Sequence, residues 1–486
     1  MAERYGQADV DHRPRFHVRP PSGWVNDPNA PVRVGGTYHL FCQFHPYATV
    51  HGDIHWAHFT STDLVRWRMH PPALVPEPGG PDADGCWSGS AVLVDGAPVL
   101  VYSGYRSDAQ PHQNVCLAWP DGAGDGWVKE AANPVVPGPP DGLATTMFRD
   151  PFVWREGEGY AAVVGSGLPG SGGAALLYRS PDLRRWRYAG PLCTAAGPVF
   201  EHVATGIGWE CPQLVRSDGT GPAFLVVSAW TPERLGPVFW VAGRLDGDRL
   251  EPALVGRLDH GPDYYAPVVM ADGERHLVWG WSWEARPAAA AAAEGWAGVL
   301  TLPRVLSAGP DGAARVAPAP ELVALRGTAT SWAGLRLDPA APVVLDPGLG
   351  DTFEVAATLR APPGGRAWLR VRSAPGGGEF TEIGVDASGP RRLAYLSREH
   401  SSADPAAARG TFSVEAVEGA VDNALRVYVD RSIIEVYVDD IHALTARVYP
   451  TRTDSIGLVA GADGGASTAQ VTAWPIDVEA VRGEAR

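Results

Sequence analysis

Residues 148–165 read FRDPFVWREGEGYAAVVG. The stretch places an acidic residue before a proline, then an apolar strand, a turn with glycine and a second apolar strand. The strand–turn–strand unit has five copies in the chain: Ala30–Phe44, Ser90–Tyr102, Pro151–Gly165, Pro212–Trp230 and Ala266–Trp281. Glycine in the turns supplies the positive φ that tight hairpins need; these turns are Gly35-Gly36, Asp95-Gly96, Glu156–Gly159, Asp218–Gly221 and Asp272-Gly273.

A second motif, S-x-D-L-x-R-W, occurs at residues 61–67 and 180–186, each time after one strand and before another short one. Repeats of several strands at this spacing are typical of blades around a channel. We therefore predict an all-β fold that begins with a five-bladed β-propeller. A generic array of β-sandwiches is the alternative.

The residue pattern changes after the fifth copy of the strand–turn–strand unit. The alanine run within Glu284–Gly298 is compatible with a short helix or a disordered insertion, and Leu302–Leu306 resembles a returning strand. Alternating strands then predict a C-terminal β-sandwich: Phe353–Leu359, Ala367–Val371, Ala424–Val429, Ile433–Val438 and Ser455–Leu458, with a hairpin turn at Asp430-Arg431. The expected division is a propeller over residues 1–325, a linker over 326–336 and a sandwich over 337–486.

Composition limits the functions that fit. A formal net charge of −15 and a pI near 5.4 repel phosphate backbones, so no nucleic-acid partner is expected. Eighteen Trp residues suit the apolar faces of sugar rings, although most Trp side chains serve packing.

The cysteines and the N-terminus bear on location. Five Cys residues without CxxC spacing fit reduced thiols. Met1–Gly6 is polar, and no apolar stretch approaches a membrane span. We expect a cytoplasmic location without a membrane partner, or secretion if a signal peptide has been removed.

Three acidic residues stand at the start of repeated units: Asp27 in Asn-Asp-Pro, Asp150 in Arg-Asp-Pro and Glu210 in Glu-Cys-Pro. We interpret them as occupying the same slot of the repeat. Inner strands of a propeller all face the channel mouth, so we expect the three carboxyl groups to converge there. Converging carboxylates with little basic character nearby indicate chemistry on glycosidic bonds.

The motifs around these acids resemble glycoside hydrolase family 32, the invertases, inulinases and levanases. Trp24–Asn29 is similar to the family's W-M-N-D-P-N-G signature, Phe148–Pro151 to its R-D-P box and Trp209–Pro212 to its E-C box. Further matches run through nearly the whole chain in the right order: Trp56–Ser61, Trp87–Ser90, Asp263–Ala266, Gly280-Trp281 and Asp430–Val436. Ala30, Ala57 and Phe41–Pro46 depart from the pattern and affect the expected substrate choice more than the reaction type.

The resemblance implies roles for the acids. Asp27 would be the nucleophile that attacks the anomeric carbon of a fructosyl group, and Glu210 would be the general acid and base. Asp150 would hydrogen-bond ring hydroxyls and stabilise the transition state, with Arg149 beside it favouring its charged form. Clustered carboxylates cannot all ionise cheaply, so we expect one pKa to rise, and the group with that raised pKa suits the general acid.

The resemblance also implies a substrate pocket. Its candidate residues are Asn26, Gln43, Trp56, Trp87, Ser88, Arg149, Asp263 and Trp281, with Tyr265 as a further candidate. The histidines at positions 39, 45, 51, 55 and 58 are close enough in sequence to suggest a metal. Their strand and loop setting favours ordinary core and loop roles instead, and we expect neither a metal nor an organic cofactor.

Four functions fit these observations. The first is a β-fructofuranosidase acting on sucrose, fructooligosaccharides, inulin or levan. The others are a fructosyltransferase with the same intermediate, a noncatalytic fructan-binding protein and an arabinan-degrading enzyme. Arg106 and Arg234 are candidates for contacting a phosphorylated sucrose, although no sequence signal places either beside the sugar.

Overall fold

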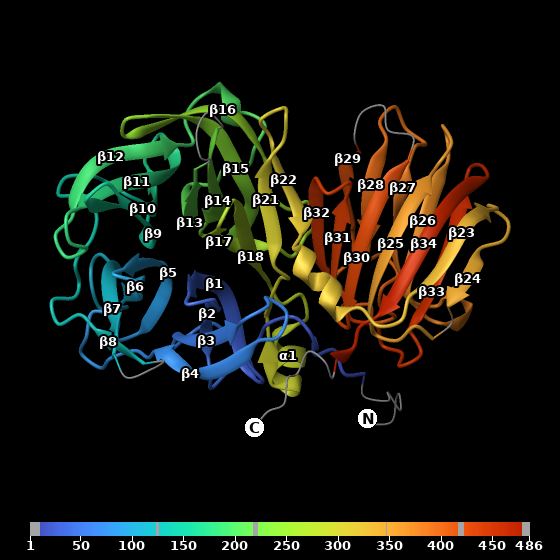
Figure 1. Cartoon of the computed structure of the whole chain (residues 1–486), viewed down its shortest axis with the longest axis horizontal. Helices are drawn as coiled ribbons and strands as arrows, with labels where there is room; N and C mark the ends of the chain where they lie inside the picture. The colour runs from blue at the N-terminus through green and yellow to red at the C-terminus, as the bar shows by residue number, and fades with distance from the viewer. Residues whose placement is uncertain (1–9, 123–125, 217–221, 347, 417–421, 479–486) are drawn as a thin grey trace.

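The computed structural model describes residues 10–122, 126–216, 222–346, 348–416 and 422–478. The expected turn at Asp218–Gly221 and the polar start Met1–Gly6 lie outside these residues. The described chain is all-β, as predicted, and forms seven sheets (Figure 1).

Five of the sheets follow one another along the first part of the chain. The first three comprise β1 (Gly23–Val34), β2 (Thr37–His45), β3 (His55–Ser61) and β4 (Arg68–Leu74); β5 (Gly85–Val94), β6 (Ala97–Tyr105), β7 (Gln113–Pro120) and β8 (Trp127–Lys129); and β9 (Phe148–Glu156), β10 (Gly159–Leu168), β11 (Gly172–Ser180) and β12 (Arg187–Thr194). The fourth comprises β13 (Gly208–Val215), β14 (Ala223–Thr231), β15 (Arg234–Asp246) and β16 (Arg249–Arg257), and the fifth β17 (Tyr265–Asp272), β18 (Arg275–Ser282), β20 (Val299–Leu300), β21 (Arg304–Ala308) and β22 (Ala314–Pro318).

The first strands of these five sheets contact one another in a cycle. β1 contacts β5, β5 contacts β9, β9 contacts β13, β13 contacts β17, and β17 contacts β1. The middle strands are buried on both faces and therefore read as apolar runs, whereas the outer strand β16 is largely exposed. The starts of the five innermost strands are thus brought near one another.

The predicted hairpins are confirmed where the structure describes them, with turns at Gly35-Gly36, Asp95-Gly96, Glu156–Gly159 and Asp272-Gly273. The two S-x-D-L-x-R-W motifs form the same turn. Asp63 and Asp182 accept backbone N–H groups two and three residues ahead, and Leu64 and Leu183 have φ of 65° and 66°. Each turn connects the third strand of a sheet to the fourth.

The alanine run forms helix α1 (Ala288–Glu294), which settles the two possibilities left by the sequence. Alanine has the highest helix propensity, and Gly295 ends the helix at φ 72°. The next residues, β19 (Trp296–Ala297), pair in parallel with β1. The chain therefore returns to its first sheet after β17 and β18, before it adds β20, β21 and β22 to the fifth.

The last two sheets have six strands each. One runs in the order β23 (Thr330–Leu337), β34 (Ser467–Pro475), β25 (Thr352–Arg360), β30 (Asn423–Asp430), β31 (Ile433–Val438) and β32 (His442–Arg447). The other runs β24 (Val343–Asp346), β33 (Gly457–Asp463), β26 (Arg366–Ser373), β27 (Thr381–Asp386), β28 (Leu393–Ser397) and β29 (Thr411–Glu415). Apolar side chains of both sheets form one shared core. Three short 3-10 turns complete the described elements: Pro198–Phe200, Pro320–Leu325 and Pro375–Gly377.

Two details differ from the sequence-based expectation. Residues 330–336, expected in a linker, belong to β23, which pairs with β34 inside a sheet. The hairpin between β30 and β31 turns at Arg431-Ser432 rather than Asp430-Arg431, because Asp430 still pairs with Ile433.

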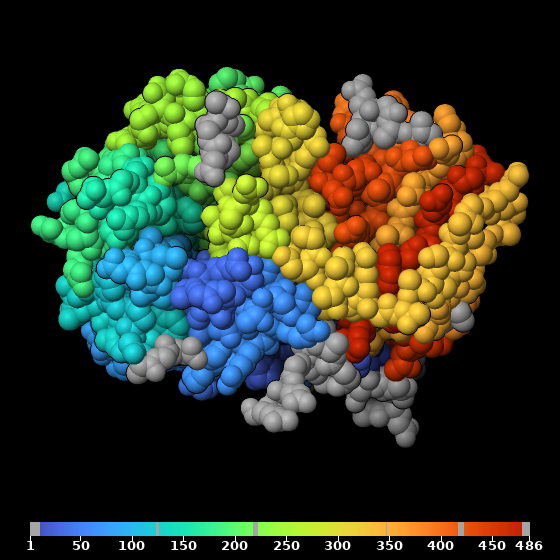
Figure 2. All heavy atoms as spheres, viewed as in Figure 1, coloured from blue at the N-terminus to red at the C-terminus, as the bar shows by residue number. Residues whose placement is uncertain are grey.

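The two parts of the chain meet over a fully buried ionic cluster. Arg304 donates to Asp259 at 2.7 Å and to Glu435 at 2.6 Å, and none of these three side chains is exposed to solvent. His17 lies between Asp430 and Glu435 at 2.8 Å and 3.0 Å. Burial alone would raise the pKa of Glu435, but Arg304 and His17 hold it near 2. The five charged or polar groups therefore fix the seam seen between the yellow and orange-red segments (Figure 2).

We expect Arg304→Met to lower the free energy of unfolding by roughly 3–5 kcal/mol, since it leaves buried carboxylates without their cation. Urea unfolding measures this directly. Arg360→Met is the control, because the pair of Arg360 with Asp422 is exposed to solvent and its loss should leave stability nearly unchanged. Equal losses in the two variants would show that the buried cluster does not stabilise the seam.

Candidate active site

A shared backbone irregularity sets the geometry of the innermost strands. Pairing in β9, β13 and β17 shifts register around Asp150-Pro151, Cys211-Pro212 and Ala266-Pro267. The residues before the prolines have φ of 64°, 48° and 48°, and Ala30 before Pro31 in β1 has φ 47°. A bulge with a left-handed residue bends a strand and re-aims its side chains.

This alignment corrects the expectation that the three acids share one slot. Asp150 stands directly before the bulge proline, whereas Glu210 precedes its bulge proline by two positions. Asp27 lies in a separate, earlier irregularity of β1. The structural equivalents of Glu210 are Arg149 and Tyr265. The acids therefore converge from different positions of the repeat.

Asp27 is held by four donors. Its Oδ2 accepts hydrogen bonds from Ser88 Oγ at 2.6 Å, Gln43 Nε2 at 3.3 Å and Cys211 Sγ at 3.5 Å, and its Oδ1 accepts one from Asn26 Nδ2 at 3.2 Å. Asn26 in turn accepts from the Trp24 indole at 3.1 Å. The carboxylate is thereby fixed in orientation.

Glu210 is held by Arg149 and Tyr265, the residues at the equivalent position of the neighbouring sheets. Arg149 donates from Nε and Nη2 to Oε1 at 2.9 Å and 2.7 Å. Tyr265 donates to Oε2 at 2.6 Å and also lies 2.9 Å from the carbonyl of Ala229. Arg149 was expected to favour the charged form of Asp150; its charge does lower the pKa of Asp150, while its hydrogen bonds go to Glu210.

Asp150 shares a partner with Asp27. Its Oδ2 accepts the backbone N–H of Cys211 at 3.0 Å and lies 3.7 Å from the Cys211 thiol, the same thiol that reaches Asp27. Its own N–H donates to Ser103 Oγ at 2.7 Å. The structure thus brings two of the predicted acids to one sulfur atom, which itself neighbours Glu210 in sequence.

Burial and the repulsion between neighbouring carboxylates raise the pKa values of Asp27 and Asp150. Burial, opposed by the Ser88 hydrogen bond and reinforced by Glu210, raises the pKa of Asp27 to about 6. Burial raises the pKa of Asp150 to about 7, although Arg149 lowers it, and the charges of Glu210 and Asp27 add to the rise. The sequence-based hypothesis placed one raised pKa on the general acid, whereas the raised pKa values here belong to the two aspartates.

Five of the predicted substrate-binding residues lie at the acids: Asn26, Gln43, Trp87, Ser88 and Arg149. The Trp87 ring and the Trp230 ring lie 5.8 Å and 5.0 Å from the Arg149 guanidinium. Gln43 Oε1 is buried and has no hydrogen-bond partner among the described residues. These groups offer the neutral donors, acceptors and aromatic faces that a sugar needs.

Three predicted residues do not reach the acids directly. Trp56 is fully buried and donates to the carbonyl of Trp87, so it packs rather than faces a pocket. Asp263 accepts from Trp283 at 2.9 Å and from Arg398 at 2.5 Å, which commits its carboxylate to the seam between the two parts.

The third of these residues, Trp281, lies 5.7 Å from the Trp24 ring, and Trp24 in turn donates to Asn26, which bonds Asp27. Trp24, Trp230 and Cys211 were not among the predicted site residues. The signal for Trp24 and Cys211 was present, because both stand inside the quoted motifs. Trp230 had no local signal and is placed by the pairing of β13 with β14.

The histidine cluster forms packing contacts. His39 Nδ1 lies 3.0 Å from His58 Nε2, and the two rings stack. Burial lowers the pKa of His58 to about 3. No group of three or more His, Cys, Asp or Glu side chains placed to hold a metal ion occurs in the described part of the chain.

Comparison with known proteins gives the family. Residues 17–317 match the N-terminal domain of glycosyl hydrolases family 32, and residues 321–475 match its C-terminal domain. The chain belongs to glycosyl hydrolase family 32. The family resemblance inferred from the sequence is therefore confirmed, and the protein is a glycosidase.

Relatives within family 32 cover almost the whole chain. Levanase of Bacillus subtilis is 32% identical over 96% of this chain and 71% of the levanase. Sucrose-6-phosphate hydrolase of Escherichia coli is 31% identical over 90% of this chain and 89% of its own length. The structure of fructan 1-exohydrolase IIa from Cichorium intybus in complex with 1-kestose is 25% identical, covers 96% of this chain and 97% of its own, and superposes with a TM-score of 0.84.

Within the described residues, no helix has the length and apolar character needed to cross a membrane.

Proposed function

We propose that this family 32 glycosidase cleaves β-fructofuranosidic bonds with retention, using Asp27 as nucleophile and Glu210 as acid and base. Sucrose, fructooligosaccharides and fructans are the candidate substrates. The observation that carries the proposal is the pair of differently held carboxyl groups. Asp27 is fixed by four neutral donors, while Glu210 lies between a guanidinium and a phenol.

Asp27 suits nucleophilic attack because its orientation is set before substrate binds. In a retaining enzyme the nucleophile attacks the anomeric carbon and forms a covalent glycosyl ester, which water then hydrolyses. The donors Ser88, Gln43 and Asn26 hold the carboxylate in place without adding a charge that would compete for it. The unpartnered Gln43 Oε1 is available to a sugar hydroxyl.

Glu210 suits proton transfer because Tyr265 has one hydroxyl proton and two acceptors. When Glu210 is ionised, Tyr265 donates to it at 2.6 Å; when Glu210 carries the proton, Tyr265 can turn to the Ala229 carbonyl at 2.9 Å and accept from the acid. Arg149 meanwhile keeps the other carboxyl oxygen in place. The same group can therefore protonate the leaving oxygen and later accept a proton from water.

Asp150 is proposed as the group that binds sugar hydroxyls and stabilises the positive charge that develops on the ring. Its backbone position before Pro151 and its bond from Cys211 fix the carboxyl beside Asp27. A raised pKa near 7 means that substrate binding and its ionisation are linked near neutral pH.

We also propose that the five consecutive sheets form a five-bladed propeller and that the two six-stranded sheets form a separate sandwich domain. The cyclic contacts of β1, β5, β9, β13 and β17 support the propeller, and pairing of β19 with β1 supports its closure. The family domains end at 317 and begin at 321. We place the division after β22, so that the predicted linker at 326–336 shortens to the residues before β23.

Ser88→Ala tests the nucleophile through pH. Because the proposed roles need both aspartates ionised, kcat/KM should fall as pH drops through about 7, the pKa of Asp150, and more steeply through about 6, the pKa of Asp27. Loss of the Ser88 hydrogen bond disfavours the ionised form, so the acidic limb should move upward by roughly one pH unit. Ser90→Ala, which removes a hydroxyl bonded to the Pro151 carbonyl, is the control and should leave the limb in place. A limb that stays fixed in Ser88→Ala would argue against Asp27.

Product chromatography tests the activity itself. The purified protein is incubated separately with sucrose, a short inulin-type oligosaccharide and levan. Free fructose from any of them supports the proposal, and the relative rates name the preferred substrate. Larger oligosaccharides without matching fructose would indicate a fructosyltransferase. No product from any of the three would revive the binding-protein and arabinan interpretations, which an arabinofuranoside assay then separates.

A further inference from the structure

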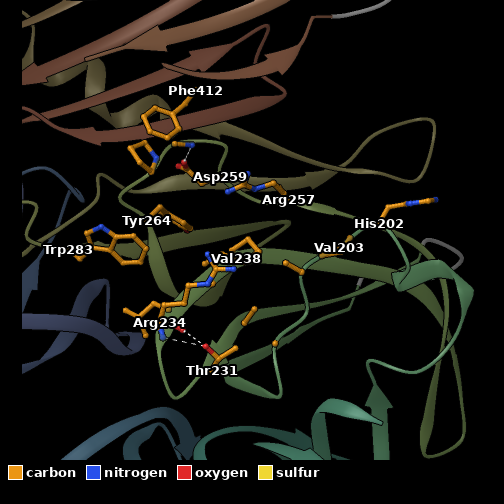
Figure 3. Close-up of a pocket in the computed structure, with 18 residues that line it drawn as sticks. His202, Val203, Thr231, Arg234, Val238, Arg257, Asp259, Tyr264, Trp283 and Phe412 are labelled. Atoms are coloured by element: carbon orange, nitrogen blue, oxygen red, sulfur yellow. Dashed lines mark hydrogen bonds between the residues drawn. The ribbon is translucent and has the colours of Figure 1, made fainter. Parts of the chain in front are cut away.

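A second cavity lies beside the acids but does not contain them. It has a volume of about 610 Å³, within the range of about 300–1,000 Å³ common for ligand pockets. Its walls come from the turn between β14 and β15, the end of β16, the segment before β17, and Phe412 of β29 in the second part of the chain (Figure 3). Asp27, Asp150 and Glu210 do not line it.

The cavity carries an excess of positive charge in a chain whose net charge is −15. Arg234 and Arg257 line it, and their side chains reach into it from opposite walls (Figure 3). Among the described residues, neither guanidinium has an ion pair or a side-chain hydrogen bond. The one acid in the lining, Asp259, is fully committed to Arg304 and so does not neutralise them.

Aromatic side chains form another wall. Trp283 and Phe412 are both partly exposed at the cavity, and the indole N–H of Trp283 is bonded to Asp263, which fixes the plane of its ring. A fixed aromatic face suits the apolar side of a sugar ring. Two unpaired guanidinium groups suit a phosphate, which accepts bidentate hydrogen bonds from arginine.

We propose that this cavity is a second carbohydrate site that takes a phosphorylated sugar, with the phosphate on Arg234 and Arg257 and the ring against Trp283. The site goes beyond the cleavage proposed at the acids. Arg106, the other arginine considered for a phosphate, is already paired with Asp108 through two bonds of 2.8 Å.

The cavity touches the catalytic machinery through two of its walls. Ala229, which lines it, accepts a hydrogen bond from Tyr265, the residue that donates to Glu210. The Trp283 ring lies 5.9 Å from the Tyr265 ring. The Tyr265 side chain therefore lies between this wall of the cavity and Glu210, the proposed acid.

Calorimetric titration of the full chain tests the proposal with three probes: glucose 6-phosphate, glucose and inorganic phosphate. Glucose 6-phosphate should bind at least about tenfold more tightly than either of the others, because only it uses both walls. Arg257→Met should weaken its binding by about tenfold or more, and Arg234→Met should do the same. Arg249→Met removes another exposed arginine of β16 that does not line the cavity, and should change affinity less than about twofold.

Three kinds of result would overturn the proposed site or its location. Absence of binding by glucose 6-phosphate, or equal affinity for inorganic phosphate, would overturn the site as a carbohydrate site. Unchanged binding in Arg257→Met and Arg234→Met would overturn its location. If fructose bound at the three acids abolished the binding of glucose 6-phosphate, the phosphate would lie in the catalytic pocket instead. Each of these results is independent of whether the enzyme hydrolyses sucrose.

Discussion

Asp27→Ala should lower kcat/KM for sucrose by roughly 10³-fold or more. The variant removes the carboxylate proposed to form the covalent ester, while Ser88, Gln43 and Asn26 remain to bind sugar. KM should change far less than kcat, because the loss falls on the chemical step. Initial rates of fructose release measure both constants.

The control for this variant is Asp141→Ala, which removes an exposed carboxylate before β9 and should leave both constants within about twofold. Thermal melting of Asp27→Ala shows whether the fold survives. A folded Asp27→Ala protein that retains substantial turnover would contradict the assignment of the nucleophile.

Glu210→Gln should produce an effect that depends on the leaving group. With sucrose, whose leaving oxygen needs a proton, the rate should fall by roughly 10²–10⁴-fold. With a fructoside whose leaving group departs without protonation, formation of the intermediate should be far less affected, and hydrolysis of the intermediate becomes the slow step. The amide keeps the shape of the side chain and the bonds to Arg149 and Tyr265 can be partly retained.

Steady-state rates on both substrates, with a pre-steady-state burst measured for the activated one, separate the two steps. Glu201→Gln, which changes an exposed glutamate on the segment before β13, is the matched control. Equal losses on the two substrates and no burst would place the acid role on another residue.

The parts of the fold that the sequence predicted are those set by local chemistry. The glycines at Gly35-Gly36 and Gly273 predict hairpins, because these turns need positive φ. The buried strand β10 is recognisable as an apolar run. The outer strand β16 was missed because it is largely exposed and lacks a clear alternation of buried and exposed residues. β23 was placed in a linker for the same reason, since most of it is exposed.

The sequence identified the three acids of the candidate site, but it did not predict how their side chains are arranged in space. The motif residues are visible in sequence, whereas the register of each bulge decides which side chain faces inward. That is why Arg149 bonds Glu210 and not its neighbour Asp150. The contact of Asp263 with Arg398 could not be predicted, because Arg398 lies 135 positions away on a segment whose place beside Asp263 has no sequence signature.

Trapping the intermediate tests the central claim most directly. Glu210→Gln is incubated with an activated β-fructofuranoside, quenched, digested and examined by peptide mass spectrometry. The account predicts one fructosyl group on the peptide from the start of β1, attached to Asp27. A fructosyl group on Asp150 or on any other residue, or a burst of product with no labelled peptide, would contradict it.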